Sequence, residues 1–164
     1  MNPAFEAIKL LPDTIAGAEI VKVEIPTEFT RSISCVEAAI KEHNPDVVID
    51  VGQAGGPTAY FATIPVKAMV QNVREHGLPC HVSFTAGTYV CNCVMYNVLH
   101  LCATKYPNIR AGFIHVPFAC EQVVGKASTM ASMPLETIAK SLEYCIEVVV
   151  TNKEEVKEAM GTTH

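Results

Sequence analysis

Hydrophobic and polar positions follow two different periods along this chain. In five segments apolar residues recur every three or four positions, which predicts amphipathic helices. Proline, asparagine or glycine stands at several of the segment ends, where these residues favour the start or the stop of a helix. The predicted helices cover residues 2–11, 27–43, 65–76, 90–105 and 134–151.

Four shorter segments between these helices have the pattern of β-strands. Residues 20–25 alternate apolar and charged side chains, as a strand with one exposed face does, and residues 47–51 form a β-branched run suited to a central strand. Residues 80–84 and 110–116 complete the set. Because strands and helices alternate, the sequence predicts an α/β fold of three layers, with a mostly parallel twisted central sheet between helices.

The composition narrows the class of protein. The chain has 164 residues, 49% of them hydrophobic and 18% charged, which is typical of one globular domain spanning residues 1–164. A net charge of -5 argues against a nucleic-acid partner. No apolar run reaches the roughly 18 residues of a membrane span, and the first residues do not have the pattern of a signal peptide. Seven cysteines with scattered spacing indicate free thiols in a reducing compartment.

One cysteine and one histidine stand out beside the predicted loops at strand ends, at residues 52–57, 85–88 and 117–122. Ligands of parallel sheets collect at the carboxyl ends of the strands. Cys91 follows the second loop, in the first turn of a predicted helix, where free N–H groups and the helix dipole favour a thiolate and an oxyanion. His115 ends the next strand. Neighbouring strands could therefore bring the imidazole within hydrogen-bond reach of the thiol.

The same residues also allow other interpretations. A cysteine in a turn of small residues is more often structural, and a histidine at a strand end is usually part of the packing. Cys91, Cys93 and His100 could form a metal or redox site, although positions 91 and 93 point to different sides of a helix and no Cys-x-x-Cys occurs. Residues 52–56 could cradle a phosphate, but the Gly-Lys-Ser/Thr sequence is absent.

Three motifs in order resemble the pyrrolidone-carboxylate peptidases, which are type I pyroglutamyl peptidases of the cytosolic cysteine class. The motifs are Gly-Gln-Ala-Gly-Gly at 52–56, Thr-Ala-Gly-Thr-Tyr-Val-Cys-Asn at 85–92 and Gly-Phe-Ile-His-Val-Pro at 112–117. The similarity extends over nearly the whole chain. It implies a hydrolase that removes N-terminal pyroglutamate (5-oxoproline) from peptides, in the cytoplasm and as a homo-oligomer, without a metal or cofactor.

The resemblance also implies roles for three residues. Cys91 corresponds to the nucleophile, His115 to the general base, and Gln53 to a glutamine at the pyroglutamate pocket. The lactam of this substrate carries no charge. A pocket with amide-type hydrogen bonds and an apolar wall therefore suits it better than one with a carboxylate.

The chain departs from the family pattern in two places. The family has a strand and a Gly-Phe-x-Pro-Phe-Gly-Gly loop before Asn-Pro, which here occupies positions 2 and 3. It also has a Glu-Arg-x-Ala-x-Asn segment and a long loop where Gly56 is followed here by Pro57. That glutamate orients the catalytic histidine, and its motif is matched by none of Glu28, Glu75 and Glu121. Either the molecule carries both segments in addition to this sequence, or it is a catalytically impaired or inactive member that binds peptides or other subunits.

Overall fold

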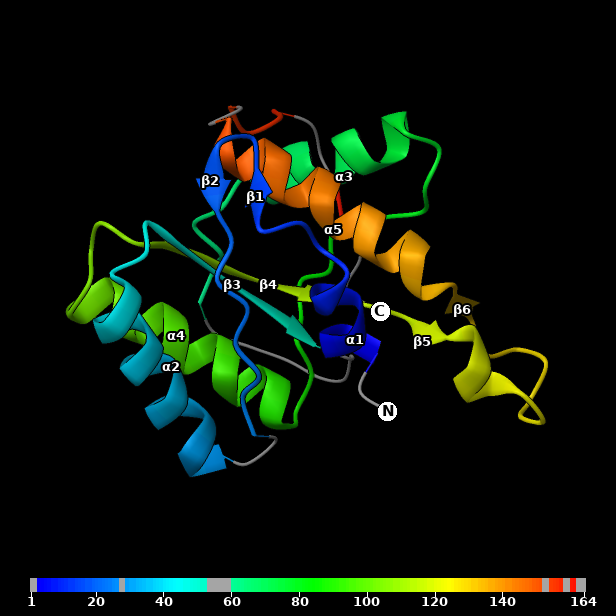
Figure 1. The fold of residues 1–164 in the computed structure, drawn as a ribbon, viewed down its shortest axis with the longest axis horizontal. Helices are drawn as coiled ribbons and strands as arrows, with labels where there is room; N and C mark the ends of the chain where they lie inside the picture. The colour runs from blue at the N-terminus through cyan, green and yellow to red at the C-terminus, as the bar shows by residue number, and fades with distance from the viewer. Residues whose placement is uncertain (1–2, 27–28, 53–59, 152–153, 158–159, 162–164) are drawn as a thin grey trace.

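The computed structural model describes residues 3–26, 29–52, 60–151, 154–157 and 160–161 (Figure 1). Its helices are α1 (Pro3–Lys9), α2 (Phe29–His43), α3 (Val66–Glu75), α4 (Val90–Thr104), the short 3-10 helix η1 (Cys120–Val123) and α5 (Leu135–Val150). Its strands are β1 (Thr14–Ile15), β2 (Ala18–Glu19), β3 (Val47–Gly52), β4 (Arg110–His115), β5 (Phe118–Ala119) and β6 (Ser132–Met133). All five helices predicted from the apolar periodicity are present. No described helix is both long enough and apolar enough to cross a membrane.

Strands β3 and β4 form the centre of the fold. They pair in parallel, in a register that runs from Val47 opposite Arg110 to Gly52 opposite His115. The other described pairs, antiparallel β1–β2 and parallel β5–β6, are only two residues long. Since β3 and β4 end at the same level, Gly52, the last residue of β3, lies directly opposite His115.

Helices cover both faces of this strand pair (Figure 1). Successive side chains of a strand point to opposite faces. Val48 and Ala111 therefore pack against α2 and α4 on one face, whereas Ile49 and Ile114 pack against α3 and α5 on the other. Helix α1 lies on the second face, beside α5. The predicted three-layer α/β arrangement is confirmed.

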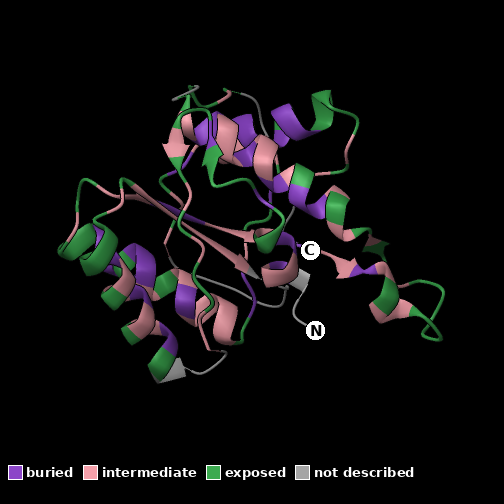
Figure 2. Cartoon of the chain, viewed as in Figure 1, coloured by how far each residue is buried: buried purple, intermediate pink, exposed green. Residues whose placement is uncertain are grey.

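In helix α5, the residues that make up the apolar periodicity are the ones buried in the core. One stripe of its residues is buried between α1, α3 and the sheet, and Figure 2 shows these positions in purple. The buried residues are Ile138, Ala139, Leu142, Cys145, Val148 and Val149. Burial of each large aliphatic side chain in such a stripe contributes roughly 1.5–3 kcal/mol to the stability of the fold. The observed helix agrees with the predicted range, 134–151, to within about one residue at each end.

Two predicted strands are wrong. Residues 20–25 contain no strand, because their apolar positions are used for packing: Ile20 contacts the cluster around α1 and α5, and Ile25 contacts the cluster between α2 and α4. Residues 80–84 show no more than an isolated bridge position at Ser83. Thr63 already occupies the edge of β4, where its N–H donates to the Ala111 carbonyl at 2.8 Å. That edge is therefore closed to a further strand at this point.

Candidate active site

The turn that leads into α4 is held by its own side chains. The Ser83 hydroxyl donates to the carbonyl of Thr85 at 3.0 Å, and the Thr85 hydroxyl accepts from the N–H of Gly87 at 3.3 Å. Gly87 has a φ of 97°, in the left-handed region that glycine adopts without steric cost. This turn leads directly into α4, whose first residue is Val90.

Cys91 lies in the first turn of α4, as the sequence predicts. Tyr89 precedes the helix in an extended conformation and makes no side-chain cap. Its carbonyl accepts from the N–H groups of Asn92 and Cys93 at 3.1 and 3.3 Å. The N–H groups of the first helical residues stand outside the helical ladder, so the positive end of the helix is directed at the half-buried thiol of Cys91. A helix N-terminus is a position at which a thiolate is generally stabilised.

His115 is the last residue of β4 and faces the layer that contains α4. It alternates with Ala111 and Phe113 on that face of the strand, and its ring packs edge-on against Phe113, with centroids 4.8 Å apart. Helix α4 packs on β4 and runs back along it, so that α4 begins at the end of the sheet where β4 finishes (Figure 1). The structure therefore brings Cys91 and His115 to the same layer and the same end of the sheet.

Asp50 is a residue that sequence reasoning missed. It lies opposite Phe113 in the ladder and projects from the same face as His115. Its Oδ2 atom is fully buried, and the described part of the chain offers that atom no hydrogen-bond partner. Burial raises the pKa of the carboxyl group to about 7. The signal in the sequence was a single acidic residue inside the β-branched run at 47–51.

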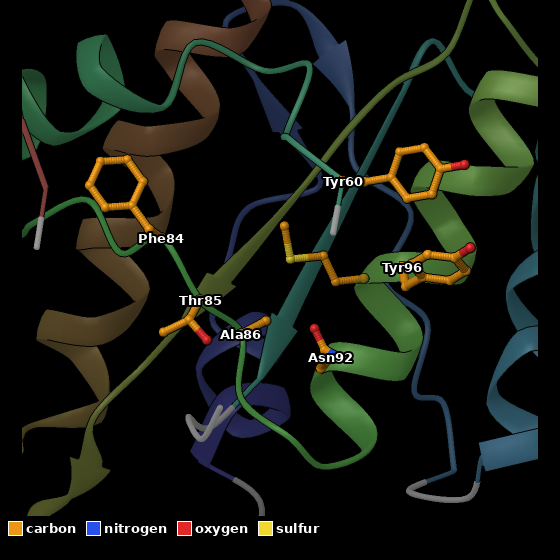
Figure 3. A pocket seen from close by; sticks show the side chains of 7 residues that line it. Tyr60, Phe84, Thr85, Ala86, Asn92 and Tyr96 are labelled. Atoms are coloured by element: carbon orange, nitrogen blue, oxygen red, sulfur yellow. The ribbon is translucent and has the colours of Figure 1, made fainter. Parts of the chain in front are cut away.

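A pocket opens beside the start of α4. Segment 84–86 lines one side and two tyrosines lie on the other, with Asn92 between them (Figure 3). It is a shallow depression that is partly open to solvent, its enclosed volume is about 30 Å³, and the described lining residues carry no formal charge. They are Tyr60, Phe84, Thr85, Ala86, Asn92, Met95 and Tyr96. Hydroxyl and amide groups among aromatic rings suit a small, uncharged polar ligand.

The other predicted site residues are Gln53, Cys93 and His100. Gln53 lies outside the described residues. Cys93 and His100 have contacts of their own: the Asn97 amide donates to Cys93 Sγ at 3.4 Å, and His100 Nδ1 lies 3.2 Å from the Tyr60 hydroxyl. Within the described ranges, three or more His, Cys, Asp or Glu side chains nowhere gather in a way that could hold a metal ion.

Comparison with known proteins gives relatives for the whole chain. The sequence model of the family described as pyroglutamyl peptidase matches residues 1–58 and 54–152. The pyrrolidone-carboxylate peptidase of Enterococcus faecalis is 48% identical, and that of Finegoldia magna 46%, each over 100% of this chain and 93% of the relative. The crystal structure of pyroglutamyl peptidase I from Bacillus amyloliquefaciens superimposes with a TM-score of 0.89 at 30% identity, over 97% of this chain and 92% of the other.

The comparisons also locate a difference inside the chain. Both alignments extend over 199 positions, 35 more than the 164 residues of this sequence. The two stretches matched by the family model meet at residues 54–58, which lie outside the described residues. Because the family model covers most of the sequence and these relatives are almost half identical to it, the chain belongs to the pyroglutamyl peptidase family.

Proposed function

We propose that this protein is a cysteine exopeptidase that hydrolyses the peptide bond after an N-terminal pyroglutamate. The observation that carries the proposal is the placement of Cys91 and His115. One lies at the positive end of α4, the other at the end of β4 on the face that α4 covers. Membership of the pyroglutamyl peptidase family supports the same chemistry.

In the proposed mechanism the thiol acts as a nucleophile and the imidazole as a proton carrier. His115 accepts the proton of Cys91, and the thiolate attacks the carbonyl carbon of the pyroglutamyl residue. The N–H groups at the start of α4 stabilise the oxyanion. His115 then donates its proton to the leaving amine, and the carbon–nitrogen bond breaks. A water molecule, deprotonated by His115, hydrolyses the thioester and releases pyroglutamate.

We propose that the substrate is recognised through its uncharged lactam. Gln53 would supply the amide-type hydrogen bonds expected from the family resemblance. The uncharged pocket beside Asn92 supports this preference (Figure 3), because a free α-ammonium group would lose its hydration there without gaining a counter-charge. The same reasoning predicts selectivity against peptides with an ordinary, charged N-terminus.

The setting of the enzyme is part of the proposal. We expect residues 1–164 to act as one peptidase domain, in the cytoplasm and without a metal or cofactor. None of the seven cysteines, all of which lie in the described ranges, is part of a disulfide, which suits a reducing compartment. We also expect a homo-oligomer. Three large apolar or aromatic side chains are strongly exposed and could be buried at a subunit interface: Phe61 is 87% exposed, Val124 81% and Tyr89 73%. Light scattering after size exclusion measures the assembly.

Hydrolysis of a pyroglutamyl amide of a fluorescent amine tests the activity. We expect release of the amine by the wild type, inhibition by iodoacetamide, and a loss of at least about 1000-fold in Cys91→Ser. Cys93→Ser is the matched control, since it removes a half-buried thiol from the same turn of α4, and it should stay within about threefold of wild type.

Two outcomes would contradict this assignment. Hydrolysis that survives Cys91→Ser would exclude Cys91 as the nucleophile. A correctly folded wild type without hydrolysis would favour the alternative, an inactive family member that binds peptides. Neither the family match nor the described contacts favour that alternative. Calorimetric titration of a pyroglutamyl peptide would then measure the binding that it requires.

A further inference from the structure

Two cysteines outside the proposed active site contact one another. Cys80 and Cys145 are 65 positions apart in the sequence, yet their side chains pack in one apolar cluster and interact with each other. Cys80 lies in the segment between α3 and α4, and Cys145 lies on α5. Both belong to the apolar cluster between α3, α5 and the strand pair. The tertiary structure therefore brings together two thiols that lie in different segments and far apart in the sequence.

The two thiols have different environments. Cys145 is only 5% exposed, and its contact with Cys80 together with burial raises its pKa. The pKa of the half-buried Cys80 is lowered, chiefly by the hydrogen bond with Cys145, then by the charge of Arg74 and the N–H of His81, although burial opposes this. Arg74 is held in place because its Nε donates to the Cys80 carbonyl at 2.7 Å. Cys80 is thus the more accessible thiol and has a positive charge near it, whereas Cys145 is enclosed.

We propose that Cys80 and Cys145 form a reversible disulfide by exchange with a low-molecular-weight disulfide such as oxidised glutathione. The Cys80 thiolate attacks one sulfur of the oxidant, whose sulfur–sulfur bond breaks and releases one thiolate. Cys145 then loses its proton to that thiolate or to solvent and attacks Cys80 Sγ. The mixed disulfide breaks and releases the second thiolate. Two protein thiols are oxidised, and one small disulfide is reduced to two thiols.

The bond would connect α5 to the segment that lines the pocket. The chain continues from Cys80 through Phe84 and Thr85, on one side of the pocket, to the start of α4 (Figure 3). A crosslink that closes so long a loop restricts the unfolded chain strongly. We expect the oxidised protein to melt about 5–10 °C above the reduced one. The inference does not depend on the proposed hydrolysis.

Peptide mapping tests the pair directly. The folded protein is incubated with oxidised glutathione, remaining thiols are alkylated, and tryptic peptides are analysed by mass spectrometry. Cys145 is the one cysteine of peptide 141–153, and Cys80 lies in peptide 75–105. We expect these peptides to be disulfide-linked in the wild type, with the link removed by dithiothreitol. The rise in melting temperature should accompany the link and disappear with it.

Variants decide which sulfurs react. The link and the rise in melting temperature should both be lost in Cys80→Ser, and Cys145→Ala should keep glutathione attached to Cys80. Cys35→Ser, which removes a half-buried thiol from α2, should behave as wild type. A link that persists in Cys80→Ser would assign it to another cysteine of the same peptide and overturn the proposal. So would a wild type that accumulates the mixed disulfide without forming the link.

Discussion

Asp50 of β3 lies directly opposite Phe113 of β4, so that its carboxyl group projects from the same face of the strand pair as the imidazole of His115. The Oδ2 atom of Asp50 is fully buried. A buried carboxyl group without a counter-charge favours its neutral form. The face of the sheet that carries His115 therefore contains a group that becomes charged near neutral pH.

Stability should depend on pH through Asp50. Its folded-state pKa of about 7 lies above the ordinary value of 3.8, so the folded state holds the proton over a range in which the unfolded chain releases it. The free energy of unfolding should fall as pH rises from 4 to 7, by up to about 4 kcal/mol, and this cost remains at higher pH. Urea denaturation at several pH values measures it.

Asp50→Asn should remove this dependence and raise the free energy of unfolding at pH 8 relative to wild type. Asp46→Asn is the matched control, since it removes an exposed carboxylate just before the same strand, and it should leave the pH dependence as it is. Equal slopes in wild type and Asp50→Asn would contradict the burial of an unpaired carboxyl group.

The side chain of Thr63 should contribute to stability through the edge of β4. Its hydroxyl oxygen accepts from the Ala111 N–H at 2.7 Å, and Ala111 is fully buried. Thr63→Val keeps the shape but leaves this N–H without its acceptor, which should cost about 1–3 kcal/mol in the free energy of unfolding. Thr63→Ser keeps the hydroxyl and should cost clearly less. Chemical denaturation of the two variants compares them, and equal losses would show that the hydrogen bond contributes nothing.

Gly112 should not tolerate a larger side chain. A Cβ atom added to it would lie 2.5 Å from Ile64 Cγ1 and closer still to Ile64 Cδ1. Ile64 is 3% exposed and has little room to move. Gly112→Ala should therefore cost about 1–3 kcal/mol in the free energy of unfolding. Combination with Ile64→Val should recover part of the loss, and strictly additive effects would show that the two side chains do not meet.

His115 should be needed for turnover rather than for folding. If it is the general base, His115→Ala should lower kcat of pyroglutamyl amide hydrolysis by about 100- to 10,000-fold with a smaller change in KM. His81→Ala, which removes an exposed imidazole, should leave both constants within about twofold. Steady-state kinetics with circular dichroism separates the two roles. A full loss of activity accompanied by unfolding would assign His115 to the core instead.

Much of this fold follows from local pattern. Each of the five helices was predictable because its apolar positions recur every three or four residues, and the strands at 47–52 and 110–115 because they are short β-branched or apolar runs between helices. The position of Cys91 at a helix start followed from the small-residue turn before it. The strands predicted at 20–25 and 80–84 failed because alternation indicates an extended segment, whereas a strand also needs a free partner edge.

The sequence by itself determined the order and type of the main elements, the family, and the proposed nucleophile, because these depend on residues close together in the chain. The tertiary structure decided which segments pair, that the edge of β4 is occupied by Thr63, that the Oδ2 atom of Asp50 is buried, and that Cys80 packs in one cluster with Cys145. These outcomes depend on contacts between residues that are tens of positions apart. No local periodicity encodes them, because they arise when helices and strands compete for the same buried surface.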